Sequence, residues 1–292
     1  YLIEKEHSVI ALSRNFHKEV QSKLVGADFF EVDLLDKNSI SENIFSNVDT
    51  IIHLAAANDQ LSRNRKMGIE LSAVGTSNLL DLAVDNNVKN FIFFSTLQVY
   101  GGELIGQYDE SKPTSPENDY AINHIFGEKY VKMYSEMHDL NSIILRPSNV
   151  FGEFVSIDID RWSLVPGCLI KEAFNTGEIN LLSSGNQNRN FISLNQVSFA
   201  TEKISNGFKY PFDIINLVSD QYFTIKDIAQ EIVDVFKEEF NKIIKLNIQS
   251  KFPDNTNIFK FSNEKIKEYG AYTVGSKTSI REGIKKIIRS IR

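Results

Sequence analysis

The chain has 292 residues, 42% of them apolar and 24% charged, and its formal net charge is −6. This size and composition fit a globular protein with one large domain or two coupled ones. Acidic and basic residues are mixed, so no nucleic-acid partner is expected, and no apolar run approaches the roughly 20 residues of a membrane span. The single cysteine, Cys168, excludes an internal disulfide framework, and a cytoplasmic protein without a membrane partner is expected. The five histidines are scattered, so no metal site is expected.

The first half of the chain alternates predicted strands with predicted helices. Residues 1–7 have the pattern of the last turns of a helix. Short apolar runs predict strands over residues 8–12, 29–32, 49–54, 91–94 and 142–145. Helices are predicted over residues 38–45, 63–86 and 120–137, and the second of them has apolar residues at helical spacing. Alternation of this kind, with short links, predicts an α/β fold built on a Rossmann-type, doubly wound parallel sheet.

The alternation changes after about residue 155. Predicted helices cover residues 166–175, 195–206, 224–240 and 279–291, and predicted strands cover residues 179–182, 190–192, 213–217 and 244–248. We therefore predict two domains. Residues 1–155 form the Rossmann-type domain, and residues 156–292 form a smaller mixed lobe with some strands returning to the main sheet.

The beginning of the chain lacks the usual opening of a dinucleotide-binding fold. Such a fold opens with a strand, a Gly-rich loop and a helix whose N-terminus holds a pyrophosphate. Here the first glycine is Gly26. The absent first strand would lie at the centre of the sheet, where its loss leaves two neighbours without ladder partners. We expect roughly 20 to 30 further native residues upstream, the length of such a unit. The alternative is that another segment fills the centre.

Three polar positions stand out around the fourth predicted strand. The apolar run 91–94 leads into Ser95 and Thr96, and Tyr120 follows at the start of a predicted helix, with His124 one turn later. This layout resembles the active site of the extended short-chain dehydrogenase/reductases, the NAD(P)-dependent nucleotide-sugar epimerase/dehydratase family. That family carries Tyr-x-x-x-Lys where this chain carries Tyr-x-x-x-His. The resemblance implies that Tyr120 is the acid/base, that Thr96 bonds the reacting sugar oxygen, and that His124 belongs to the catalytic group.

The histidine changes the expected chemistry. A free phenol has a pKa of about 10, so the family's lysine helps by supplying a fixed positive charge, and it also holds the ribose. An imidazole with a pKa of about 6.5 is mostly neutral at pH 7. Ser72 also stands where the family carries a supporting Asn. Two hypotheses stay open: an enzyme with a retuned site, or a weakened or inactive homologue that senses a nucleotide or nucleotide sugar.

The cofactor contacts are expected from the ends of the first-half strands. The segment from His53 to Ala56 resembles the family's His-Leu-Ala-Ala, and Asp33 with Leu34 resembles the pair beside adenine. The resemblance implies cofactor contacts from Asp33, Leu34, Leu54, Ala55, Ala56, Ser95 and Pro147. Arg14 closes the second strand of the fold with no acid before Glu19, and a guanidinium suits a 2′-phosphate. NAD or NADP is therefore expected, with NADP favoured.

The substrate contacts are expected from both halves of the chain. Residues 146–152 resemble Arg-Pro-x-Asn-Val-Tyr-Gly, which implies a substrate contact from Asn149, and residues 185–192 resemble a motif whose Arg, here Arg189, pairs with a diphosphate. Gln98 and Leu164 are the other expected substrate contacts, although Ser163 replaces the Asn of the family's Asn-Leu-x-Pro. Family dehydratases carry acids where Leu97 and Gln98 stand, so dehydration is not expected.

The combined prediction favours an enzyme. The resemblance implies an NAD(P)-dependent nucleotide-sugar epimerase or ketosugar reductase whose partner is a nucleotide sugar. It also implies a homodimer formed through the helices 63–86 and 120–137.

Overall fold

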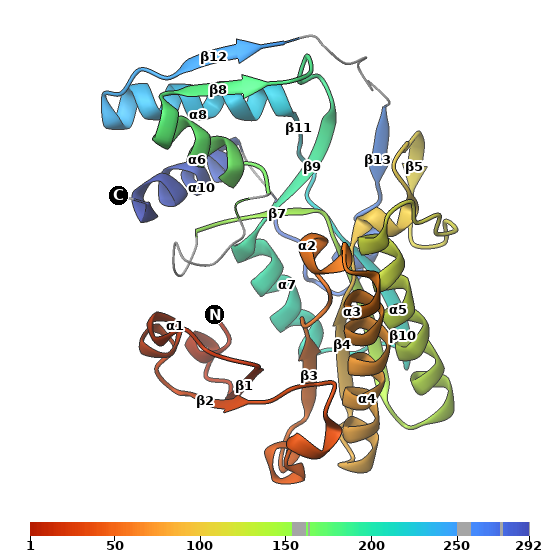
Figure 1. Cartoon of the computed structure of the whole chain (residues 1–292). Coiled ribbons are helices and arrows are strands. Elements are labelled where there is room, and N and C mark those ends of the chain that lie inside the picture. Colours follow the sequence, from red (N-terminus) through yellow and green to blue (C-terminus); the bar gives the residue numbers. More distant parts are fainter. Residues whose placement is uncertain (154–161, 163, 250–257, 275–276, 292) are drawn as a thin grey trace.

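The main sheet of the protein is parallel and carries helices on both faces (Figure 1). The computed structural model describes residues 1–153, 162, 164–249, 258–274 and 277–291. Its largest sheet has four strands in the order β10-β6-β4-β3, all parallel. These strands are β3 (Thr50–His53), β4 (Asn90–Phe94), β6 (Asn141–Pro147) and β10 (Phe212–Leu217). The predicted Rossmann-type α/β fold is confirmed.

The first two strands form a sheet of their own. β1 (Val9–Ser13) and β2 (Ala27–Glu31) pair in parallel, joined by α1 (Lys18–Lys23), a helix that the sequence did not predict. In the described part of the chain no ladder joins this pair to β3. Side chains make the connection instead, because Ile10 and Leu12 pack against the core cluster that contains Leu80 and Phe91.

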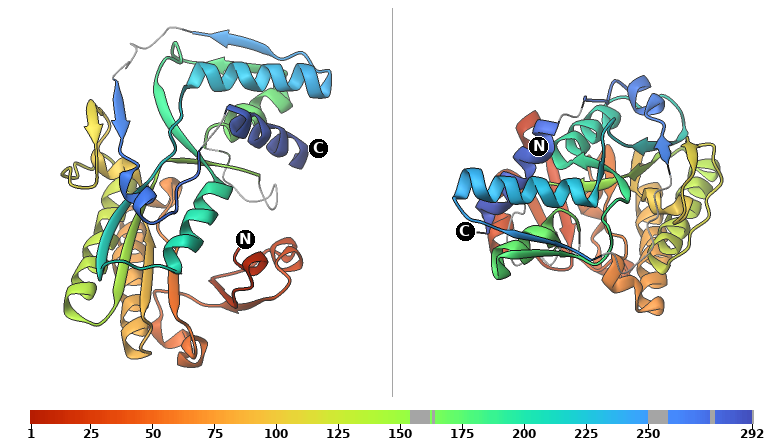
Figure 2. Two further views of the ribbon diagram at one scale, coloured as in Figure 1. Left: turned by 180° about the vertical axis from the view of Figure 1, so that it is seen from behind. Right: turned by 90° about the horizontal axis from the view of Figure 1, so that it is seen from above.

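Two helical segments cover one face of the main sheet (Figures 1 and 2). The segment predicted as one helix over residues 63–86 consists of α3 (Arg65–Ile69), the π-helical turn η4 (Glu70–Gly75) and α4 (Thr76–Asp85), and the short helix α2 (Asp59–Ser62) precedes it. The side chain of Asn64 accepts from the backbone N–H of Met67 and starts a new helix there, which explains the interruption. The helix predicted over residues 120–137 is confirmed as α5 (Asp119–Met137), capped by Asn118.

A glycine brings α5 into direct contact with β4. A Cβ atom at Gly127 would lie 2.3 Å from the ring of Phe93, far closer than a real side chain permits. Phe93 is fully buried in the core cluster that α4 and α5 share with the sheet. The absence of a side chain at residue 127 therefore sets the spacing between this helix and the strand beneath it.

The second half of the chain builds a smaller mixed lobe, as predicted. The lobe contains the sheet β11-β9-β7, in which β11 is antiparallel, and the parallel pair β12-β8. Its strands are β7 (Asn149–Phe151), β8 (Glu178–Leu181), β9 (Asn188–Ser193), β11 (Tyr222–Thr224) and β12 (Lys245–Ile248). Its helices α6 (Gly167–Thr176), α8 (Ile225–Phe240) and α10 (Lys277–Ser290) enclose a second core.

Some elements of the second half return to the main sheet. α7 (Leu194–Ser205) packs with α9 (Glu264–Glu268) against the face opposite α5, and β10 extends the sheet beside β6. β5 (Gly106–Tyr108) pairs with β13 (Phe259–Phe261) across a long stretch of sequence. In the described part of the chain, no helix combines the length and apolar character that crossing a membrane requires.

Two predicted helices are wrong. The chain has the 3₁₀-helix η1 (Ile3–Lys5) in place of a helix end over residues 1–7, and Glu6 ends it in a left-handed conformation. The predicted helix 38–45 is two short 3₁₀-helices, η2 (Lys37–Ser39) and η3 (Glu42–Phe45). The Asp36 side chain accepts from the N–H of Asn38 and the Ser39 hydroxyl donates to the Asp36 carbonyl, so local side-chain bonds compete with a continuous helix.

Candidate active site

The carboxyl ends of three parallel strands meet at one edge of the main sheet. The ladder registers place His53 beside Phe93 and Phe94 beside Leu145. Ser95 continues this ladder, because its N–H donates to the carbonyl of Leu145 at 2.7 Å. Ligands of parallel α/β sheets bind outside such carboxyl ends, so the residues that follow β3, β4 and β6 form the candidate site.

The turn after β4 presents two buried hydroxyl groups. Ser95 donates to a carboxylate oxygen of Glu128 at 2.5 Å. The Thr96 hydroxyl oxygen accepts from the N–H of Gln98 at 3.2 Å and so caps the 3₁₀-helix η5 (Leu97–Tyr100). The proton of the Thr96 hydroxyl is not used in this bond, so it can be donated to a ligand oxygen.

One side of α5 carries the other site residues. Tyr120, His124 and Glu128 follow one another at intervals of four residues, which places them along one face of the helix. The rings of Tyr120 and His124 are in contact, with centroids 4.4 Å apart and planes tilted by 53°. Nδ1 of His124 donates to the carbonyl oxygen of Tyr120 at 2.9 Å. Burial lowers the pKa of His124. The hydrogen bond to Tyr120 and the charge of Glu128 act in the opposite direction but are smaller, so the ring is neutral at pH 7.

A buried ion pair lies below the two rings. Arg146, at the end of β6, donates to both carboxylate oxygens of Glu128, at 2.8 and 2.6 Å. Both side chains are almost fully buried. Arg146 also donates to the hydroxyl oxygen of Tyr100 at 2.9 Å, and its guanidinium lies over the ring of Tyr100. We call Ser95, Glu128, Arg146 and Tyr100 the clamp, because they tie the turn after β4, α5 and β6 together.

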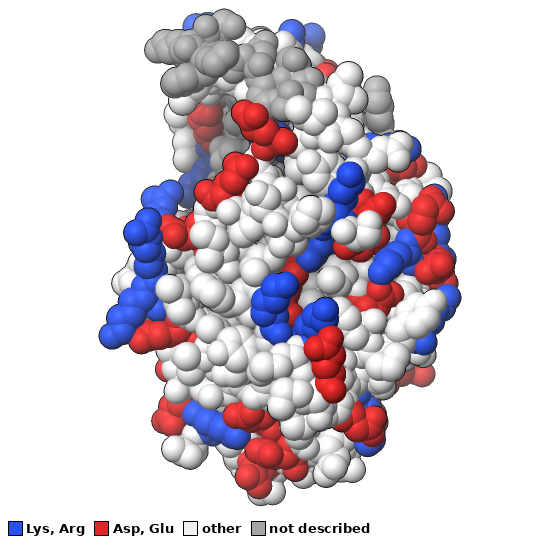
Figure 3. All heavy atoms as spheres, turned by 90° about the vertical axis from the view of Figure 1, so that its right-hand side faces the viewer, with Lys and Arg blue, Asp and Glu red and all other residues white. Residues whose placement is uncertain are grey.

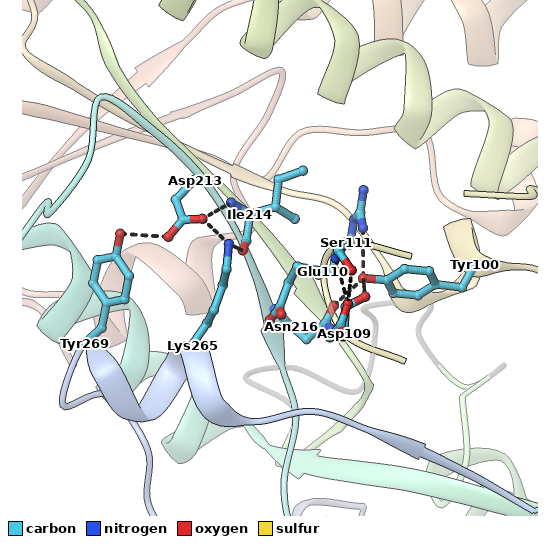
Figure 4. A network of polar contacts seen from close by, with 10 residues as sticks. Tyr100, Asp109, Glu110, Ser111, Asp213, Ile214, Asn216, Lys265 and Tyr269 are labelled. Atoms are coloured by element: carbon cyan, nitrogen blue, oxygen red, sulfur yellow. Dashed lines mark hydrogen bonds and ion pairs between the residues drawn. The ribbon is translucent and has the colours of Figure 1, made fainter. Parts of the chain in front are cut away.

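The clamp continues into β10 (Figure 4). The Tyr100 hydroxyl points at Asn216 and lies 2.9 Å from its side-chain oxygen. The backbone N–H of Asn216 donates to the carboxylate of Glu110 at 2.8 Å, and burial raises the pKa of Glu110. These bonds fix the long connection between η5 and α5 onto β10. The start of α5, where Tyr120 lies, is therefore between two fixed points: Glu110 before it in the chain and Glu128 after it.

The predicted cofactor residues lie at strand ends and are mostly accessible. Leu54 is 67% exposed and Ala55 is exposed beside it, directly after β3. Ala56 and Pro147 are half-buried, and Arg14 is exposed at the end of β1. The exposed side chain of Leu54 offers an apolar surface for a flat aromatic ring, and the small residues beside it leave room for that ring. This edge therefore fits a nicotinamide dinucleotide.

The predicted adenine contacts lie after β2. Asp33 is exposed, and its carboxylate accepts from the N–H of Leu35 at 3.0 Å. Leu34 is buried, and its carbonyl accepts from the side chain of Asn78 at 2.8 Å. Leu34 also lies close to Gly75 of η4. The end of β2 is therefore fixed to α4 and η4 by these contacts.

The predicted substrate residues divide into two groups. Gln98 is exposed near the start of α5, where the side chain of Asn118 donates to it at 3.2 Å. Asn149 donates to the carbonyl of Asn190 at 2.8 Å, and Leu164 is 49% exposed. Ser163 lies outside the described residues. Arg189 belongs to the second lobe, where it lines an open pocket of about 470 Å³ with Asn180, Leu181, Leu182, Ser183, Gln187 and Ile225.

Sequence reasoning missed the clamp, and it named His53 only as part of the His-Leu-Ala-Ala resemblance, without a role of its own. His53 is fully buried at the end of β3, and its Nε2 lies 3.0 Å from the hydroxyl of Thr76. Burial, and then the nearby His124, lower its pKa to about 4. The available signal for the clamp was Arg146, a charged residue that directly follows the apolar run Ile143–Leu145 of a buried strand. Among the described residues, no group of three or more His, Cys, Asp or Glu side chains could hold a metal ion.

The fold and the site together define a class of protein. A parallel sheet with a Ser-Thr turn after β4 and a tyrosine on the following helix is the arrangement of a short-chain dehydrogenase/reductase. Residues 1–203 match the model of the NAD dependent epimerase/dehydratase family, and the chain belongs to this family. The resemblance that the motifs indicated is confirmed. The family's description also agrees with the predicted NAD or NADP.

Known relatives extend over most of the chain. The human dTDP-D-glucose 4,6-dehydratase is 29% identical over 250 residues, which cover 84% of this chain and 69% of that protein. Among solved structures, a UDP-glucose 4-epimerase of Thermotoga maritima with UDP-glucose has a TM-score of 0.81 at 21% identity, covering 99% of this chain and 92% of that one. A UDP-glucuronic acid 4-epimerase of Bacillus cereus in complex with NAD also has a TM-score of 0.81, at 18% identity, with the same coverage. The two structures support the fold.

Proposed function

We propose that this chain is an NAD(P)-dependent oxidoreductase of nucleotide sugars, either an epimerase or a ketosugar reductase, with Tyr120 as its acid/base. The observation that carries the proposal is the placement of Tyr120 and Thr96. Thr96 lies in the turn after β4, Tyr120 lies in the first turn of α5, and the clamp joins that helix to that turn through Ser95 and Glu128.

Each residue has a role that its surroundings support. Tyr120 exchanges a proton with the reacting sugar oxygen, and the hydroxyl of Thr96 donates a hydrogen bond to the same oxygen. When bound, the dinucleotide supplies or accepts the hydride. Arg189 attracts the substrate diphosphate, with Gln98, Asn149 and Leu164 as further substrate contacts. The residues that would hold the dinucleotide are Arg14, Asp33, Leu34, Leu54, Ala55, Ala56, Ser95 and Pro147.

The rival function is a sensor that binds its ligands without turnover. The observation that favours it is the neutral, buried His124, which provides no fixed charge beside Tyr120. Two measurements separate the functions: fluorescence of bound NADH and NADPH, and turnover with a panel of nucleotide sugars and nucleotide-linked ketosugars. Turnover with any member supports the enzyme. Tight dinucleotide binding without hydride transfer supports the sensor, and tighter NADPH binding supports the assignment of Arg14.

The two predicted domains divide these roles. In this proposal, residues 1–155 hold the dinucleotide and the acid/base, and residues 156–292 supply Arg189 and Leu164. The Arg189 pocket supports the division, because all its lining residues lie in the second half of the chain.

The protein is further proposed to form a homodimer through residues 63–86, which contain α3, η4 and α4, and residues 120–137, which belong to α5. Met67 and Val74 are 42% and 46% exposed on the first segment, and Ile122, Met133 and Met137 are 38%, 41% and 67% exposed on α5. α5 contacts both α3 and η4, so these apolar side chains lie on neighbouring helices. Figure 3 shows the side of the molecule on which α5 lies, where broad uncharged areas separate the charged side chains. A second copy of the chain would cover such a face.

The dimer is tested by mass in solution. We expect light scattering to give a mass twice the chain mass of 33.2 kDa, and a shift towards the monomer in the double variant Val74→Glu, Met133→Glu. Ile243→Glu is the matched control, because Ile243 is an 87% exposed apolar residue away from these helices. A monomeric wild type, or an equal shift in the control, would contradict the proposal.

A further inference from the structure

The orientation of the His124 ring fixes which nitrogen carries its proton. A carbonyl oxygen can only accept, so the short contact from Nδ1 to the carbonyl of Tyr120 places the hydrogen on Nδ1. In the neutral ring, Nε2 then keeps its lone pair. Nε2 can accept a hydrogen bond from a hydroxyl group, such as one on a ribose, but it brings no positive charge. The ring is only 4% exposed, so water gives an imidazolium little solvation there.

The charged groups around His124 do not reverse this state. On its own helix, Glu128 would favour an imidazolium, but its carboxylate already accepts from Arg146 and Ser95. From β3, the nearby His53 adds no opposing charge, because burial lowers its pKa to about 4 and leaves it neutral as well. From β4, the neighbour is the apolar ring of Phe93, 6.4 Å away between centroids. From α3, Arg65 pairs with Asp119 at the start of α5.

The charge state decides what the neighbouring phenol can do. A fixed cation one helical turn away stabilises a tyrosinate, whereas a neutral imidazole leaves a phenol protonated at neutral pH, since its ordinary pKa is about 10. A protonated phenol can give a proton to a carbonyl oxygen. Epimerisation of a nucleotide sugar must begin the other way, with removal of a proton from a sugar hydroxyl group.

We propose that the neutral His124 makes Tyr120 a proton donor, so that this site reduces a nucleotide-linked ketosugar supplied by another enzyme rather than epimerising a nucleotide sugar. In the reduction, the carbonyl carbon gains a hydride from a reduced nicotinamide dinucleotide, and the carbonyl oxygen gains the phenolic proton. The ketone becomes an alcohol, the dinucleotide leaves oxidised, and the tyrosinate takes a proton from water. The enzyme that supplies the ketosugar substrate must make it by an oxidation or a dehydration. This inference rests on the proposed function.

The first test is the protonation of Tyr120 itself, which requires no turnover. The ultraviolet difference between wild type and Tyr120→Phe reports tyrosinate at residue 120. We expect none at neutral pH in the wild type, and we expect tyrosinate to form at least about one pH unit earlier in His124→Lys, in the direction that a neighbouring cation dictates. Tyrosinate at neutral pH in the wild type would overturn the proposal.

The second test is the pH dependence of each direction. For reduction with NADPH or NADH, we expect kcat/KM to stay constant from neutral pH to about pH 9, because the phenol remains protonated. For oxidation of the alcohol product, kcat/KM is expected to rise about tenfold per pH unit over that range. His124→Lys moves both transitions to lower pH. An oxidation rate that is independent of pH around neutrality contradicts the inference.

Two further variants are controls for these pH profiles. His124→Gln cannot be charged, so it keeps the wild-type pH profiles if the inference is right, and a large alkaline shift would show that His124 was cationic. His138→Lys places the same substitution at an exposed histidine that ends α5, and no profile should change. If bound dinucleotide gives no turnover in either direction, the proposed enzyme function fails, while the tyrosinate titration still decides the protonation state.

Discussion

Replacement of Tyr120 by Phe is expected to lower kcat by about 10²- to 10⁴-fold, the usual contribution of a general acid/base. The substitution removes the phenolic oxygen and keeps the ring that contacts His124. The packing at the start of α5 therefore stays intact. Dinucleotide binding, measured by fluorescence, should be almost unchanged, because the loss falls on the proton transfer and not on the binding residues at the strand ends.

Tyr130→Phe is the matched control for this result. Tyr130 lies on the same helix and is only partly buried, and it is outside the proposed site. Its variant should keep the wild-type kcat. Activity retained in Tyr120→Phe would show that another group moves the proton.

Replacement of Glu128 by Gln is expected to lower the free energy of unfolding by about 3–5 kcal/mol, the cost of leaving one partner of a buried ion pair without the other. Arg146 is only 3% exposed, and its guanidinium would keep its charge with no carboxylate to accept from it. Urea denaturation measures the change. The double variant Glu128→Met, Arg146→Met removes both charges and should recover a large part of the lost stability.

A surface pair provides the comparison. Lys132 and Glu136 lie 3.6 Å apart on the exposed side of the same helix. Lys132→Ala should cost less than about 1 kcal/mol, because an exposed ion pair is solvated and screened. A loss in Glu128→Gln no larger than that of Lys132→Ala would mean that the clamp does not carry the stability assigned to it.

The sequence predicted the main sheet well for a physical reason. Strands buried on both faces of a parallel sheet are continuous apolar runs, as in residues 91–94, and such runs are visible without knowing their partners. Three-residue strands such as β5 and β7 carry no such pattern, because partners far away in sequence define them. The helix over residues 38–45 failed because Asp and Ser side chains bond the local backbone there.

The site was predictable only where it is local. Tyr120 and His124 are one turn apart on a helix, so their contact follows from spacing alone. Glu128 and Arg146 are on different elements, and their pairing depends on how α5 packs against β6. The position of the His124 proton depends on a side-chain rotamer, which spacing does not determine. The sequence thus predicted Tyr120 as the acid/base, which stays a proposal, and the structure added the charged and neutral groups that surround it.

The missing side chain at Gly127 has a consequence for how this protein can vary. The residue touches no proposed ligand, yet any larger side chain there would push the ring of Phe93 or lift α5 from the sheet. Tyr120, His124 and Glu128 would move together, because one helix carries all three. Tolerance of substitution should therefore be low at a position with no chemistry of its own. In a mutational scan, substitutions at residue 127 should lower activity as substitutions in the active site do, although Gly127 determines only the spacing between α5 and β4.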